Sequence, residues 1–176
     1  VTRPASHLYS IFRMDKVEVI DNFLPDSQFK SLENIFLGCE FPWYYHSPDH
    51  KDNQFQFTHT FFDSRPPWNG SQTYFPTVRM FLKPLGARGL IRIKSNLQTK
   101  TIFHRKSPRG YHIDFANVLT SIYYVNTNNG WTHIKDHGKV KSVANRMVVF
   151  DSNLEHTGYS CTNENVRVVI NFNFVR

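Results

Sequence analysis

Cysteine is scarce in this chain, which has only Cys39 and Cys161 among its 176 residues. Two cysteines do not provide the disulfide framework with which small secreted domains compensate for a limited core. We therefore expect a reducing, cytoplasmic setting. The sequence also has no apolar run approaching the roughly 18 residues that a membrane-spanning helix requires. No membrane segment is expected.

Several motifs that mark common enzyme classes are missing as well. The chain has no glycine-rich phosphate loop, no G-x-S-x-G nucleophile motif and no C-x-x-C pair. It has no run of five or more basic residues either, although Lys and Arg outnumber Asp and Glu by 21 to 14 and the net charge is +7. Such scattered charge fits polyanionic or acidic-peptide partners, and it equally fits a basic solvated surface.

Aromatic residues are plentiful, at 15% of the chain with 16 Phe. Bulky rings of this kind fill the inward faces of a β-barrel or sandwich. The length suits one domain with a full core, and we place that domain at residues 14–176. Residues 1–13, which precede Met14, are expected to be an added or disordered extension.

Short strands separated by turn signals are the main pattern in the sequence. Such spacing indicates an all-β core, a barrel or sandwich, rather than alternating β/α units. Helical periodicity over 24–38 and 76–85 predicts two helices that buttress the sheet. Between them, 40–75 is expected to be mostly loop. The expected strands cover 17–23, 54–62, 90–97, 119–125, 132–136, 140–143, 146–150 and 166–174.

A candidate metal site begins in residues 111–115. On a β-strand, residues two apart project from the same face, so His112 and Asp114 are expected to point the same way. H-x-D alone is weak evidence, but His156 follows the apolar strand 147–150 closely and provides a third ligand. Two imidazoles and one carboxylate suit non-haem Fe(II), because they leave open positions for a co-substrate and dioxygen.

The strand predicted at 166–174 carries a second site candidate. Its period of two puts Arg167 and Asn171 on one face, opposite an apolar face. A buried arginine requires an anionic partner. Either one of the chain's own carboxylates or a dicarboxylate co-substrate would supply it, and we favour the co-substrate because the guanidinium fork binds carboxylates bidentately. Asn96, on the strand at 90–97, is a further candidate for cofactor contact.

Taken together, these motifs resemble the Fe(II)/2-oxoglutarate-dependent dioxygenases of the prolyl 4-hydroxylase-like branch. The resemblance covers roughly residues 90 to 174 and rests on His112-x-Asp114, Tyr123-Tyr124-Val-Asn126, Asn129-Gly130-Trp131-Thr132, 145–151, His156 and Arg167. It implies a double-stranded β-helix, or jelly roll, in which residues 14–176 form a single dioxygenase domain. The implied metal ligands are His112, Asp114 and His156. Arg167 is implied to hold the distal carboxylate of 2-oxoglutarate, with the Tyr124 hydroxyl on that same carboxylate.

Within this resemblance the substrate is left open. The branch implies prolyl hydroxylation of a protein or peptide, and aromatic residues at 41–75, such as Trp43, Tyr44, Tyr45 and Trp68, would suit an extended peptide. The same rings would also stack on bases, so oxidative demethylation of nucleic acid is the alternative, followed by hydroxylation of a small molecule. A non-catalytic metal-binding β-barrel is the rival from another class. The oligomeric state is not predicted.

Overall fold

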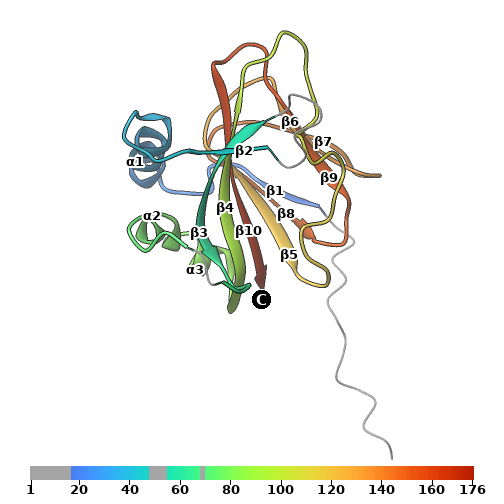
Figure 1. Ribbon diagram of the computed structural model, residues 1–176. Coiled ribbons are helices and arrows are strands. Elements are labelled where there is room, and N and C mark those ends of the chain that lie inside the picture. The colour runs from blue at the N-terminus through green and yellow to red at the C-terminus, as the bar shows by residue number, and fades with distance from the viewer. Residues whose placement is uncertain (1–16, 48–54, 68–69) are drawn as a thin grey trace, which may run out of the picture.

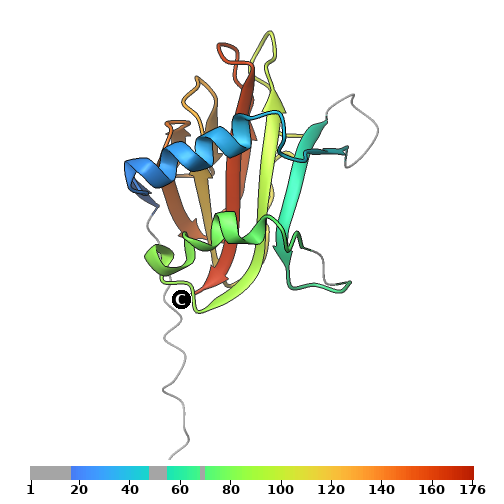
Figure 2. The ribbon, with the colours of Figure 1, turned by 90° about the vertical axis from the view of Figure 1, so that its left-hand side faces the viewer.

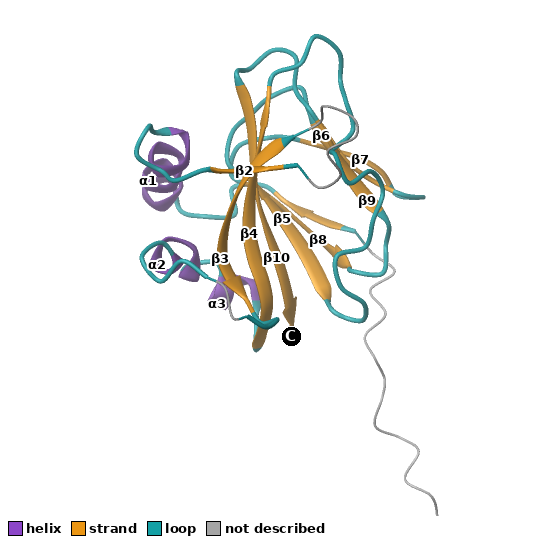
Figure 3. Ribbon diagram, in the orientation of Figure 1, coloured by secondary structure: helices purple, strands orange, loops and turns teal. Residues whose placement is uncertain are grey.

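Strands make up most of the protein, and helices lie along one side of them (Figure 1). The structure, a computed structural model, describes residues 17–47, 55–67 and 70–176. The extension expected at residues 1–13 lies outside the described residues. Within them, ten strands form two antiparallel sheets, which is the all-β, jelly-roll core expected from the sequence (Figure 3).

The larger sheet has seven strands and the smaller has three. The larger one runs in the order β1 (Glu18–Ile20), β8 (Arg146–Asp151), β5 (Leu119–Tyr124), β10 (Val166–Val175), β4 (Gly89–Thr99), β3 (Gln56–Asp63) and β2 (Tyr44–His46). The smaller one runs β7 (Gly138–Lys141), β6 (Trp131–Ile134) and β9 (His156–Tyr159). The neighbours β4, β3 and β2 are consecutive in sequence, whereas the pairings of β1 with β8 and of β10 with β4 and β5 join distant parts of the chain.

Three helices cover one face of the larger sheet, as Figure 2 shows. The first, α1 (Asp26–Leu37), follows Pro25 and ends before Gly38, as expected, and it buries Phe29, Leu32 and Phe36. The single helix expected at 76–85 is wrong. Two short helices, α2 (Phe75–Arg79) and α3 (Leu82–Leu85), occupy this region. A continuous helix would need a hydrogen bond from Pro84, which has no N–H and would clash with the carbonyl of Met80.

Strand β10 separates the protein into two apolar layers. Val168, Ile170, Phe172 and Phe174 are fully buried on the face that packs against the helices. The opposite face carries Arg167, Val169, Asn171 and Asn173, and Val169 packs in the core between the two sheets. This division follows the period of two predicted from the sequence, and it turns Arg167 toward the space between the sheets.

Three local predictions are wrong. Residues 44–46, expected to be loop, form β2 and pair with β3. His156 lies on β9 rather than in a loop. The stretch 111–115 is not a regular strand: it forms one isolated bridge, from His112 to His156. Its pairing ends there because the chain turns away, and Asn117 adopts a left-handed conformation with φ 61°.

Within the described residues, no helix has the length and apolar character needed to span a bilayer.

Candidate metal and co-substrate site

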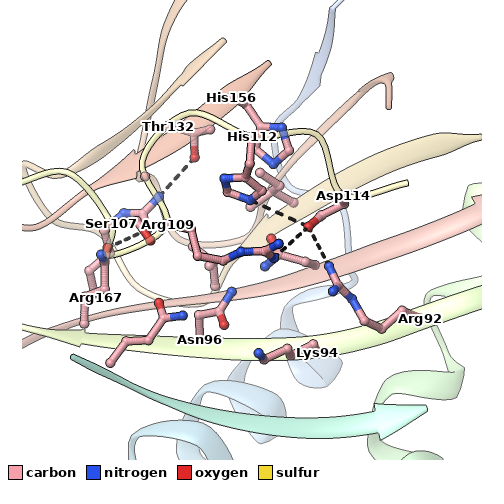
Figure 4. Close-up of a pocket in the computed structure, with 16 residues that line it drawn as sticks. Arg92, Lys94, Asn96, Ser107, Arg109, His112, Asp114, Thr132, His156 and Arg167 are labelled. Atoms are coloured by element: carbon pink, nitrogen blue, oxygen red, sulfur yellow. Dashed lines mark hydrogen bonds and ion pairs between the residues drawn. The ribbon is translucent and has the colours of Figure 1, made fainter. Parts of the chain in front are cut away.

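A polar cavity opens between the two sheets, roofed by the segment 100–118 (Figure 4). Strands β4 and β10 form its floor, and β6 and β9 form the opposite wall. Its lining includes Gln56, Arg92, Lys94, Asn96, Gln98, Ser107, Arg109, His112, Asp114, Thr132, His156, Gly158, Arg167 and Asn171. The three predicted metal ligands and the predicted arginine therefore share one cavity.

His112, Asp114 and His156 converge although residues 111–115 are not a strand. One ligand atom from each of the three lies within 4.8 Å of the others. Paired backbone hydrogen bonds hold the two histidines opposite each other, from His112 N to His156 O (3.1 Å) and from His156 N to His112 O (3.0 Å). The isolated bridge thus brings the ligands together, which a full strand had been expected to do.

Both histidines have backbone hydrogen-bond partners that suit metal binding. The Nδ1 atom of His112 lies 2.9 Å from the Gly110 carbonyl, and that of His156 lies 3.3 Å from the Leu154 carbonyl. A carbonyl can only accept, so each Nδ1 carries the proton and each Nε2 keeps a free lone pair. Two such lone pairs beside a carboxylate form the donor set that suits non-haem Fe(II).

Asp114 has a partner that sequence reasoning missed. Its Oδ1 atom lies 2.7 Å from Nη2 of Arg92, and both side chains are buried. Burial by itself would raise the pKa of Asp114, but the charge and hydrogen bond of Arg92, together with the neighbouring His156 and His112, outweigh it and lower that pKa to about 2. The carboxylate is therefore ionised and held in place. Arg92 and Asn96 are four residues apart on the strand expected at 90–97, so the period of two puts them on one face, and that pattern was the available signal.

Arg167 is almost completely buried, with 3% of its surface exposed. Its guanidinium donates hydrogen bonds to Ser142 Oγ (3.0 Å), Gln98 Oε1 (3.3 Å) and Thr132 Oγ1 (3.0 Å), all neutral. No carboxylate pairs with it among the residues that the structure describes. Burial lowers the pKa of Arg167, yet a guanidinium stays charged. The geometry thus favours an external carboxylate as its partner.

Two glycines make room for this arginine. A Cβ atom on Gly130 would lie 2.8 Å from Cδ of Arg167 and 2.7 Å from the Tyr159 carbonyl oxygen. A Cβ atom on Gly158 would lie 3.2 Å from Nη1 of Arg167. A side chain at position 130 would force Arg167 or the adjacent backbone to shift, and one at position 158 would press against the guanidinium. The glycine in Asn129-Gly130-Trp131-Thr132 is therefore needed for packing against Arg167.

Of the other predicted cofactor residues, two line the cavity and one, Tyr124, does not. Asn96 and Asn171 both line the cavity, and the side-chain oxygen of Asn96 is buried without a hydrogen-bond partner. Tyr124 is fully buried behind the wall, where its hydroxyl donates to Thr132 Oγ1 at 2.8 Å. Thr132 also accepts from Arg167, so its own hydroxyl proton is free to point into the cavity. The hydroxyls that contact the guanidinium thus belong to Thr132 and Ser142.

No family model and no curated protein sequence matches this chain. Solved structures do match it. A prolyl-4-hydroxylase from Pseudomonas putida has a TM-score of 0.59 at 14% identity, covering 91% of this chain and 92% of its own. A prolyl hydroxylase from Trichoplax adhaerens, in complex with a peptide fragment of the hypoxia inducible factor oxygen degradation domain, has a TM-score of 0.58 at 13% identity, covering 92% and 84%.

A third match is the non-haem α-ketoglutarate-dependent epimerase of nogalamycin biosynthesis. It has a TM-score of 0.60 at 10% identity, covering 90% of this chain and 77% of its own. These likenesses extend over nearly the whole domain. The fold is therefore that of the 2-oxoglutarate- and Fe(II)-dependent oxygenases, as the sequence motifs implied.

Proposed function

We propose that this protein is an Fe(II)- and 2-oxoglutarate-dependent dioxygenase that hydroxylates a C–H bond. One observation carries the proposal. The convergent His112, Asp114 and His156 share a cavity with a buried arginine, Arg167, that has no carboxylate partner among the described residues. A purely structural metal site would not require a buried arginine beside it. A purely structural arginine would not require three convergent metal ligands in the same cavity.

Each group has a distinct task in this proposal. His112, Asp114 and His156 would hold Fe(II), which when bound supplies dioxygen activation coupled to decarboxylation of 2-oxoglutarate. Arg167 would bind the distal carboxylate of 2-oxoglutarate bidentately. Thr132 would donate its free hydroxyl proton to that carboxylate, oriented by Tyr124. This assigns to Tyr124 an indirect role in place of the direct contact that the sequence implied.

A protein or peptide is the substrate that we favour, with proline as the residue hydroxylated. The similar Trichoplax adhaerens structure contains a peptide. On this chain Tyr44 and Tyr45 are exposed, at 61% and 63%, on the edge strand β2. Trp43, by contrast, is half-buried and packs against Phe41 at the edge of the core. Trp68 lies outside the described residues.

The proposal is tested by anaerobic titration followed by turnover. Adding 2-oxoglutarate to the Fe(II)-loaded protein should produce a visible charge-transfer band, and admitting dioxygen should release succinate. A non-catalytic metal-binding barrel would show neither. Arg79→Met, an exposed change on α2 across the sheet from the cavity, is the matched control for arginine variants. Absence of both signals in the folded, metal-loaded protein would exclude the proposed function.

Salt dependence separates a peptide substrate from the nucleic-acid alternative. Binding of single-stranded oligonucleotides weakens with a log-log slope of about −0.7 per phosphate contact. A neutral proline-rich peptide should show almost no slope. If only alkylated oligonucleotides stimulated succinate release, and bound with a steep slope, the protein would be a nucleic-acid demethylase.

A further inference from the structure

The cavity contains more positive charge than the proposed chemistry uses. Four cationic side chains line it, those of Arg92, Lys94, Arg109 and Arg167, against the single carboxylate of Asp114 within that lining. Binding of Fe(II) and 2-oxoglutarate would not remove the excess positive charge, because the two positive charges of Fe(II) are matched by the two carboxylates of 2-oxoglutarate. Asp114 is already paired with Arg92 at 2.7 Å. Lys94 and Arg109 are left over, and their charged groups lie away from Arg167, on the side of the cavity that holds Asp114 (Figure 4).

Lys94 is held in this position by the sheet. It lies on β4, where it pairs with Asn171 of β10 and Thr60 of β3, so its strand is enclosed on both sides. Its side chain projects into the cavity and has neither a hydrogen bond nor an ion pair with any described residue. Burial, with Arg92 and Arg109 nearby, lowers the pKa of Lys94 to about 8. A partly buried ammonium without a partner is costly unless a ligand provides one.

Arg109 approaches from the opposite side. It belongs to the segment that roofs the cavity, and its nearest acid is Asp114, with Nη1 and Oδ1 3.7 Å apart. That distance is long for a charge-assisted hydrogen bond, which is usually about 2.8 Å, and Arg92 already occupies the same oxygen. Asn96 lies two residues beyond Lys94 on the cavity face, with its side-chain oxygen buried and unpartnered. The two cations thus face one space, and the amide of Asn96 forms part of its wall.

We propose that Lys94 and Arg109 bind a carboxylate of the substrate, next to the position that is hydroxylated. The proposal rests on the dioxygenase function above and deepens it, because it names an acidic substrate. The carboxylate belongs either to a free acid or to an acidic side chain of a peptide. A nucleic-acid backbone fits less well, because it needs a surface track of cations, whereas Lys94 is recessed inside the cavity.

The first test measures anion binding without turnover. The metal-free protein is titrated with sodium acetate at constant ionic strength, and the side-chain NMR signals of Lys94 and Arg109 are followed. Saturable shifts are expected, with the dissociation constant raised at least tenfold by Lys94→Met. Lys83→Met, an exposed change on α3 across the sheet, is the matched control and should leave binding unchanged.

Two results of this titration would overturn the proposal. One is the lack of saturable shifts at Lys94 in the folded wild-type protein. The other is binding that survives Lys94→Met and Arg109→Met but is lost in Arg167→Met, which would place the only anion site at the co-substrate end. Lys94→Arg should restore binding to within a few fold, and a thermal melt of each variant separates lost binding from lost folding.

The second test identifies the source of the carboxylate. Succinate release is measured with L-proline against L-prolinamide, and with a proline-containing peptide carrying glutamate against the same peptide carrying glutamine. In one of these pairs the acid should have a KM at least tenfold lower than its amide, and Lys94→Met should bring the ratio close to one. Equal KM values in both pairs, or turnover confined to alkylated oligonucleotides, would overturn the acidic-substrate assignment.

Failure of the proposed dioxygenase function would give a different result from failure of the carboxylate site. If acetate binds at Lys94 but no substrate, acid or amide, promotes succinate release from the Fe(II)-loaded protein, the dioxygenase assignment fails and the anion site remains.

Discussion

Replacing Arg167 with methionine should separate the binding of 2-oxoglutarate from the stability of the fold. The guanidinium is buried and makes three hydrogen bonds, all to neutral oxygens. Removing them costs about 1.5–3 kcal/mol each, while burial of an unpaired charge costs several kcal/mol. These contributions have opposite signs. The free energy of unfolding of the unliganded protein should therefore change by about a few kcal/mol, well below the roughly 4.5–9 kcal/mol that loss of the three hydrogen bonds alone would cost.

Binding of 2-oxoglutarate should respond much more strongly. A desolvated charge pair is worth about 2–5 kcal/mol when one partner is truncated. Since each 1.4 kcal/mol is tenfold, the dissociation constant should rise by about 30-fold to several thousand-fold. Arg167→Lys should fall between the wild type and Arg167→Met, because an ammonium keeps the charge and loses the planar fork.

Thermal unfolding measures both effects in one assay. At one hundred times the wild-type dissociation constant, 2-oxoglutarate should stabilise the Mn(II)-loaded, anaerobic protein by about 2.7 kcal/mol, which is about 5–11 °C in Tm for a protein of this size. The same concentration should stabilise Arg167→Met by less than about 1 kcal/mol. An undiminished shift in the variant would refute the reasoning and make Arg167 a structural residue.

Three further predictions concern the metal ligands, the glycine behind Arg167 and the buried histidine. Asp114→Asn and His156→Ala should each abolish Fe(II)-dependent succinate release in a protein whose circular dichroism is unchanged; turnover in either would remove that residue from the ligand set. Gly130→Ala should displace Arg167 and weaken 2-oxoglutarate binding at least tenfold by calorimetry, because the added Cβ would lie 2.8 Å from its Cδ; unchanged affinity would show that the loop yields. Burial lowers the pKa of His59 below its usual 6.5. Below pH 6.5 this histidine is therefore protonated in the unfolded chain but stays neutral in the folded protein. The free energy of unfolding then falls by up to about 1.4 kcal/mol for each pH unit. His59→Phe should reduce this acid-side loss, compared by urea unfolding at pH 7.5 and 5.5; an identical loss would mean that His59 is protonated in the fold.

Asparagine is preferred to alanine at position 114 because of Arg92. Alanine would leave that guanidinium, only 7% exposed, without its ion pair. Removing one partner of a buried pair costs about 3–5 kcal/mol. Loss of activity in Asp114→Ala would thus mix loss of the metal with loss of the fold, whereas asparagine keeps a polar side chain beside Arg92.

Local periodicity was enough to predict much of this protein. Alternation along 166–174 determined which side chains of β10 face the helices and which face the cavity, because successive residues on a strand must point to opposite sides. Helical spacing over 24–38 predicted α1. The all-β core and the set of His112, Asp114, His156 and Arg167 also follow from residue types, order and spacing.

Contacts between distant segments were decided only by the tertiary structure. Strand β2 forms because β3 offers it an unpaired edge, which no pattern within residues 44–46 reveals. His112 and Asp114 meet His156 through an isolated bridge rather than through the expected strand. Which strands become neighbours determines the ion pair of Arg92 with Asp114 and the hydrogen bond of Tyr124 to Thr132. It also determines the position of Lys94, which has no ion pair with any residue that the structure describes. Those pairings join residues far apart in the sequence, and local propensity carries no information about them.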